Sequence, residues 1–222
     1  MNEENNNFSV DTEQLKSETK DTVNQVKDTI KNADFKEGAA QTKGFLMDMF
    51  SKPISTVKKV ASEEENVLFK AIMIMMLYIG ISFVRDLIYT LRVRKYITFG
   101  NNLIFLAYSI IQPMLVVLIP AILVFVLNKK NKKTLTTILC TLVVASVPCI
   151  VTELITLIND FSSSIVTITS IISTIVTAVG YVLTYFGMKE LFEEDDDKFI
   201  KTFAIIKLIS AFAFLIIREI LF

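Results

Sequence analysis

Residues 103–127 read LIFLAYSIIQPMLVVLIPAILVFVL, an almost continuously apolar stretch. A helix rises about 1.5 Å per residue, so ~20 apolar residues cross the roughly 30 Å hydrocarbon core of a bilayer. Lipid cannot hydrogen-bond backbone groups, so such a stretch must be a helix or a barrel strand, and the ~10-residue alternation of barrel strands is absent. Four further stretches have the same character: residues 67–91, 135–158, 163–188 and 199–222. The sequence therefore predicts an all-α polytopic membrane protein with a five-helix transmembrane bundle.

Composition narrows the function classes. Lysine plus arginine equals aspartate plus glutamate, so no net field favours nucleic acid as a partner. The chain has no histidine, which removes the common zinc-hydrolase patterns, and it lacks the glycine-rich nucleotide-binding motifs. Cys140 and Cys149 lie nine residues apart on one predicted helix, on opposite faces, and cannot form a disulfide with each other. We predict a protein that is not an enzyme and needs no cofactor or metal.

The chain ahead of the spans divides into two parts. Residues 1–43 are polar, begin with MNEENNN, and are predicted to form a largely disordered or weakly helical cytoplasmic tail. Residues 44–65 are amphipathic, with Phe45, Leu46, Met49, Phe50, Ile54 and Val57 gathered on one side among lysines. This pattern is typical of a helix in the membrane interface, with an ordinary helix packed on the bundle as the alternative. Pro53 is expected to kink or break it. Residues 66–222 then form the five-span domain.

Basic residues near the span ends predict the orientation. Short joints make neighbouring helices antiparallel, so the N-terminal flank shares one side with residues 128–134 and 189–198. That side carries Lys52, Lys58, Lys59, Lys70, Lys129, Lys130, Lys132, Lys133, Lys189, Lys198 and Lys201, whereas the other has Arg92, Arg94 and Lys95, with Arg85 and Arg218 toward its span ends. Because lysine and arginine concentrate on the cytoplasmic side, we expect a multi-pass protein of the cell membrane with its N-terminus in the cytoplasm and its C-terminus outside.

Ionisable residues inside the spans form a candidate site. Charges at membrane depth are costly and are functional candidates by default. Arg85 and Asp86 lie toward the outer end of the first span, Glu153 toward that of the third, and Arg218 toward that of the fifth. We expect these four to form an intramembrane polar cluster in which Glu153 faces the bundle interior beside an arginine, Arg85 in preference to Arg218. An ion-pair network that sets helix register is the first interpretation, and a proton- or ion-binding site is the alternative.

Hydroxyl side chains follow one face of the fourth span at helical spacing. The stripe consists of Ser163, Thr167, Ser170, Thr174, Thr177, Tyr181 and Thr184. Small and hydroxylated residues often mark faces where membrane helices pack closely, so the stripe is predicted to be a helix-packing face. A polar lining for a solute path is the alternative. The acidic run EEDDD at residues 193–197 is predicted to be a solvated cytoplasmic loop, with binding of a divalent cation or a basic partner as the alternative.

Several short motifs carry a family resemblance. Phe50-Ser-Lys-Pro53 leads through STVKKV to the first span, Ala145-Ser-Val-Pro148 lies within the third, and Phe186-Gly-Met-Lys-Glu-Leu191 ends the fourth. Over about residues 45–222 the chain resembles bacterial members of the Yip (Ypt-interacting-protein) family. The resemblance implies five spans, a cytoplasmic N-terminus and no catalytic residues. Eukaryotic relatives act in vesicle trafficking with Rab-type GTPases, whereas bacterial members have no generally established activity.

Two functions remain open from the sequence. The first is a non-enzymatic integral membrane protein that organises protein partners or lipid at the cytoplasmic membrane. Its partners would be the lipid bilayer and membrane or cytoplasmic proteins that the sequence does not name, and a homo-oligomer is compatible with it. The second is a small transporter or channel that uses Glu153 and the hydroxyl stripe of the fourth span.

Overall fold

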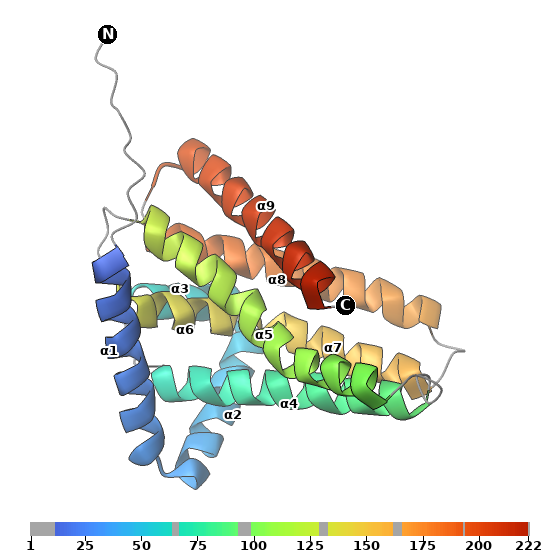
Figure 1. Ribbon diagram of the computed structural model, residues 1–222. Helices are drawn as coiled ribbons and strands as arrows, with labels where there is room; N and C mark the ends of the chain where they lie inside the picture. The colour runs from blue at the N-terminus through green and yellow to red at the C-terminus, as the bar shows by residue number, and fades with distance from the viewer. Residues whose placement is uncertain are drawn as a thin grey trace.

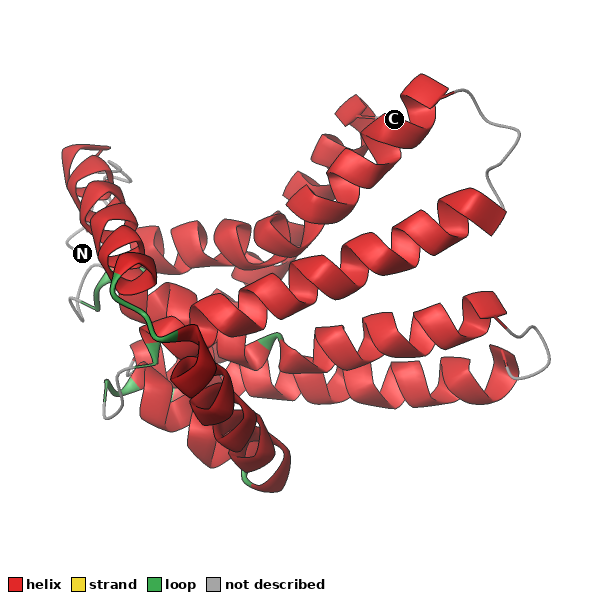
Figure 2. Cartoon of the chain, turned by 90° about the horizontal axis from the view of Figure 1, so that it is seen from below, coloured by secondary structure: helices red, strands yellow, loops and turns green. Residues whose placement is uncertain are grey.

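The computed structural model describes residues 12–63, 67–92, 99–128, 133–161, 166–192 and 194–221. The described chain folds entirely into helices joined by short loops (Figures 1 and 2). The helices are α1 (Thr12–Lys31), α2 (Phe35–Ser51), α3 (Pro53–Ala61), α4 (Leu68–Arg92), α5 (Phe99–Leu127), α6 (Leu135–Ala145), α7 (Val147–Phe161), α8 (Val166–Phe192) and α9 (Asp196–Leu221). The predictions for residues 1–7 and for Ser163 fall outside the described residues.

Five helical segments are long and apolar enough to cross a membrane, which confirms the predicted bundle. Helices α4, α5, α8 and α9 each supply one span, and α6 and α7 together supply the third. The third span is interrupted at Ser146, two residues before Pro148, because a proline inside a helix removes a donor and clashes with the preceding turn. Pro113 and Pro120, in contrast, lie within the continuous helix α5.

The third span lies at the centre of the bundle. Its residues are the most buried of the five spans, whereas those of α9 are the least buried. Helix α4 packs against α5 and α7, α7 packs against α8, and α9 rests mainly on α5. The spans lie close together near the N-terminal end and spread apart toward the other end, as Figure 2 shows. The exposed apolar side chains of the outer helices therefore form the surface available to lipid.

Helices α1, α2 and α3 gather at the end of the bundle where the first span begins (Figure 1). Helix α1 crosses this end at a steep angle to the spans and contacts α4 and α6. The Thr22 and Thr136 hydroxyls lie 3.1 Å apart, and the Thr136 hydroxyl donates to Gln25 at 3.0 Å. Within the predicted tail, residues 12–31 thus form a complete helix docked on the bundle. Its contacts are with residues distant in sequence, which local sequence pattern does not predict.

The predicted break at Pro53 is present and separates α2 from α3. Helix α2 begins at a cap in which the Asp34 carboxylate accepts from the Lys36 and Glu37 amides at 2.9 and 3.2 Å. Helix α3 turns back and packs against α6 and α8, with Val57 and Ala61 fully buried. The predicted amphipathic segment is thus present as α2 and α3 with a break between them, and its location in the membrane interface stays a prediction. The α3 part follows the alternative of a helix packed on the bundle, because its apolar face meets protein.

Candidate functional site: an intramembrane polar cluster

Arg85 lies between two carboxylates, in the half of the membrane domain that is farther from α1–α3. Its Nε donates to Asp86 Oδ1 at 2.7 Å, and its Nη1 forms an ion pair with Glu153 Oε2 on α7. Asp86 and Glu153 are buried and Arg85 is partly buried. The expected contact between Glu153 and Arg85 is thus confirmed, with Asp86 helping to hold the guanidinium. A functional role for the cluster stays a prediction.

A cavity of about 360 Å³ opens beside this pair, between α4, α5 and α9. Arg85 and Asp86 form one wall, and Arg218 of α9 lines the cavity with them, so the four predicted residues do gather in one region. The remaining walls are formed by Phe105, Tyr108, Gln112 and Phe214. Sequence reasoning missed these four residues. Gln112 could have been found from the sequence, because it is a side-chain amide directly before a proline in an otherwise apolar span.

The charges of the cluster determine what it can do. Arg85 contributes one positive charge beside the two carboxylates of Asp86 and Glu153. With Arg218, which lines the same cavity, the region holds two positive and two negative side chains. Removing one partner of a buried pair costs about 3–5 kcal/mol, because the other charge remains without compensation. The groups of the cluster can fix the positions of α4 and α7 relative to each other or hold a polar ligand.

Most of the hydroxyl stripe of α8 is exposed, although the Tyr181 ring contacts Lys207 of α9, whose Nζ lies 5.0 Å from the ring centroid. Thr167, Ser170, Thr174, Thr177 and Tyr181 are exposed, and Thr184 is half-buried. Packing within this chain uses another face instead, which carries Gly180, Leu183, Gly187, Met188 and Leu191. Most of the described stripe is thus not used for packing within this chain, and its role as a helix-packing face stays a prediction.

Hydrogen bonds to carbonyls of the same helix explain how hydroxyl groups of the stripe can lie on an exposed face. The Thr174 hydroxyl donates to the Ser170 carbonyl at 2.9 Å, and the Thr184 hydroxyl donates to the Gly180 carbonyl at 2.8 Å. A threonine that is satisfied by its own helix needs no partner across an interface. None of the stripe residues that the structure describes lines the cavity beside Arg85.

The acidic run after α8 pairs with neighbouring lysines. Lys198 Nζ lies 3.1 Å from Glu194, and Lys189 pairs with Asp196. Within the described ranges, no group of three His, Cys, Asp or Glu side chains is placed to hold a metal ion. Cys140 and Cys149 are both free thiols, as their spacing predicted.

The fold and this cluster define a multi-pass helical membrane protein. A family model, the Yip1 domain, matches residues 47–217, so the chain belongs to the Yip family. The match covers α3, the first four spans and most of α9, whereas α1, the first part of α2 and the last residues of α9 lie outside it. No curated protein and no solved structure matches the chain.

Proposed function

We propose that this protein is a non-enzymatic membrane protein that organises protein partners or lipid at the cytoplasmic membrane through α1–α3. The observation that carries the proposal is the docking of these three helices on one end of the bundle, where they form a platform rather than a loose tail. Helix α1 presents charged side chains outward, together with the exposed apolar residues Val23 and Ile30. Both kinds of side chain are available to a partner.

The lysine distribution supports a cytoplasmic position for this platform. Lys58, Lys59, Lys70 and Lys189 all belong to the end of the bundle on which α1–α3 lie. Positively charged residues near span ends favour the cytoplasmic side. We therefore place the N-terminus in the cytoplasm and the C-terminus outside.

Site-specific crosslinking in native membranes tests the partner role. A photoreactive residue at Val23 of α1 should yield protein adducts that mass spectrometry identifies, and the same residue at Ile175, an exposed position in the middle of α8, serves as the control. We expect a defined protein adduct at Val23 and only lipid adducts at Ile175. Absence of protein adducts at Val23, Lys20 and Ile30 alike would contradict a protein-organising role.

A small transporter or channel is the second candidate. The buried Glu153–Arg85 pair beside the cavity favours it, because such pairs can exchange a partner for a proton or an ion. A transporter in which Glu153 and the hydroxyl stripe of α8 line one solute path is less favoured, because most of the stripe is exposed. Uptake of an ion or solute into proteoliposomes that Glu153→Gln abolishes would favour the transporter over the organising role.

A further inference from the structure

An open groove of about 320 Å³ runs between α2 and α4 at the end of the bundle that carries the platform. Its apolar lining includes Leu46, Met47 and Phe50 of α2 and Met73 and Leu77 of α4, and Lys43 also lines it. Leu77 is nine residues inside α4, roughly 13 Å beyond Leu68 at the rise of an α-helix. The groove thus extends from the start of the first span toward the hydrocarbon region.

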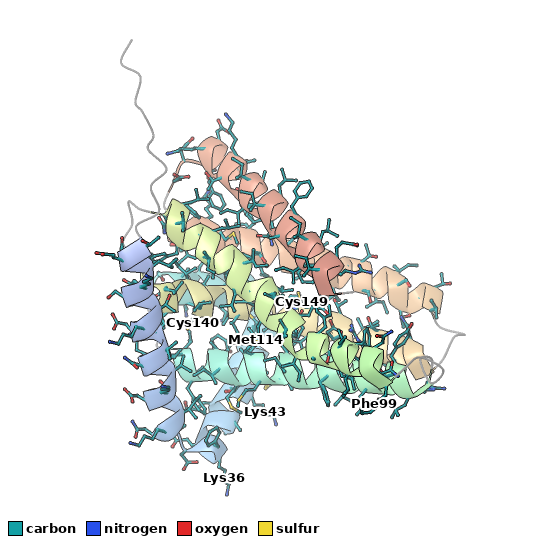
Figure 3. The ribbon with its side chains drawn as sticks, in the orientation of Figure 1. Lys36, Lys43, Phe99, Met114, Cys140 and Cys149 are labelled. Carbon is teal, nitrogen blue, oxygen red and sulfur yellow. The ribbon has the colours of Figure 1, made fainter. Side chains whose placement is uncertain are left out.

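Helix α2 carries lysine at one end of this groove and apolar residues at the other. Lys36, Lys43, Met47 and Phe50 recur at spacings that place them on one face of the helix, and all four are exposed. Figure 3 labels both lysines, with Lys36 near the start of α2 and Lys43 further along the helix toward α4. Met47 and Phe50 are 65% and 66% exposed. The face is therefore basic in the first half of α2 and apolar toward its end.

The acidic residues of α2 do not share this face. At about 100° per residue, Glu37 and Asp48 lie roughly a quarter to a third of a turn away from the lysines. The Glu37 carboxylate also accepts from the Gln41 amide at 3.0 Å, which engages it along its own side of the helix. This face of α2 consequently offers an anion two ammonium groups: Lys43 lines the groove, Lys36 lies two turns before it, and Glu37 and Asp48 lie on another side of the helix.

We propose that this groove binds one anionic phospholipid of the inner leaflet, with an acyl chain along Met47, Phe50 and Leu77 and the phosphate at Lys43 and Lys36. A phospholipid fits because the groove continues into the lipid-facing surface of α4, where Met76 and Leu77 are 53% and 44% exposed. The proposal rests on the lipid-organising part of the proposed function and names its ligand class and its site.

The absence of tryptophan from the chain allows a direct test in the full-length protein. A single Phe50→Trp reporter, in vesicles that contain phospholipids with brominated acyl chains, measures which lipid occupies the groove by fluorescence quenching. Val182→Trp is the matched control, because Val182 is an exposed apolar position of α8 whose nearest basic neighbour along the helix, Lys189, pairs with Asp196. The two probes are brominated phosphatidylglycerol and brominated phosphatidylcholine.

We expect the Phe50→Trp reporter to prefer phosphatidylglycerol over phosphatidylcholine by about 5-fold or more, since each lysine near an anionic headgroup contributes about that factor. Lys36→Gln with Lys43→Gln should remove the preference, whereas Lys16→Gln with Lys20→Gln, two exposed lysines of α1, should leave it unchanged. An equal preference at Val182→Trp, or a preference that survives Lys36→Gln with Lys43→Gln, would overturn the site. The crosslinking at Val23 is a separate readout, so the lipid site and the protein-organising role can fail independently.

Discussion

Glu153 and Asp86 both contact the Arg85 guanidinium, so Arg85 is expected to be the most sensitive residue of the polar cluster. Arg85→Ala removes the cation that contacts both buried carboxylates and should destabilise the bundle by about 3 kcal/mol or more. Glu153→Gln keeps the shape of the side chain and leaves Arg85 paired with Asp86, so it should cost about 1 kcal/mol. Unfolding of the purified protein in micelles measures both, with Glu219→Gln at an exposed carboxylate as the control. An Arg85→Ala protein as stable as the wild type would contradict the ion-pair interpretation.

Gly187 is the second residue whose replacement has a sharp expected result, because α3, α6 and α8 meet there. A Cβ at Gly187 would lie 2.7 Å from Val57 Cγ1 and 2.9 Å from Thr141 Cγ2. Gly187→Ala should therefore destabilise the protein by about 1–3 kcal/mol through overpacking. Gly80→Ala is the control, since nothing lies within 4 Å of its added Cβ, and it should be neutral or stabilising.

The same unfolding measurement gives a second check on Gly187. Val57→Ala removes the nearest obstructing methyl groups, so adding it to Gly187→Ala should recover part of the lost stability. If the losses of unfolding free energy from the two single substitutions simply add in the double variant, the close approach of α3 to α8 does not cause the destabilisation by Gly187→Ala.

At the scale of elements, α9 is the span held by the fewest contacts with the bundle, and an aromatic cluster fixes its first turns. Phe199 is fully buried, with ring centroids 5.2 Å from Tyr185, 5.7 Å from Phe192 and 6.0 Å from Phe203. Phe199→Ala should cost about 3–5 kcal/mol and release α9 before the other spans. Limited proteolysis between α8 and α9 measures this release. Phe212→Ala, at an exposed position of the same helix, should leave cleavage unchanged.

Sequence predicted the spans well and the faces of the helices poorly. Span length and apolar content alone place α4, α5, α8 and α9 to within a few residues, because the hydrocarbon thickness fixes how many residues are needed. Pro148 likewise predicts the interruption between α6 and α7. Which face of a span meets protein is not fixed this way, because lipid is as apolar as a protein interior. The hydroxyl stripe of α8 is the clear example, since its helical period says nothing of the neighbour it meets, and most of it is exposed in the single chain.

The polar cluster was partly predictable for a related reason. An arginine and two carboxylates at membrane depth have few ways to avoid an unpaired charge, so Arg85 and Glu153 could be expected to meet. The cavity next to them also needs Phe105, Tyr108 and Phe214, whose aromatic side chains are equally at home against lipid. The docking of α1 was hidden as well, because it depends on hydroxyl contacts such as Thr22 with Thr136.

At the scale of the whole molecule, the two ends of the bundle differ. One end is closely packed and carries α1–α3, the lysines and the α2–α4 groove, whereas the other spreads apart around the Arg85 cavity. Both the partner role and the lipid role require the packed end to face the cytoplasm. Its orientation is therefore the central claim.

Labelling of single cysteines with a membrane-impermeant maleimide tests this claim most directly. With Cys140 and Cys149 replaced by alanine, Asn32→Cys reports the turn between α1 and α2, and Asn101→Cys reports the opposite end of the bundle, in the first turn of α5. Both positions are exposed. We predict that Asn101→Cys is labelled in intact cells and that Asn32→Cys is labelled only after the membrane is permeabilised. Labelling of Asn32→Cys in intact cells, with Asn101→Cys protected, would contradict the cytoplasmic platform.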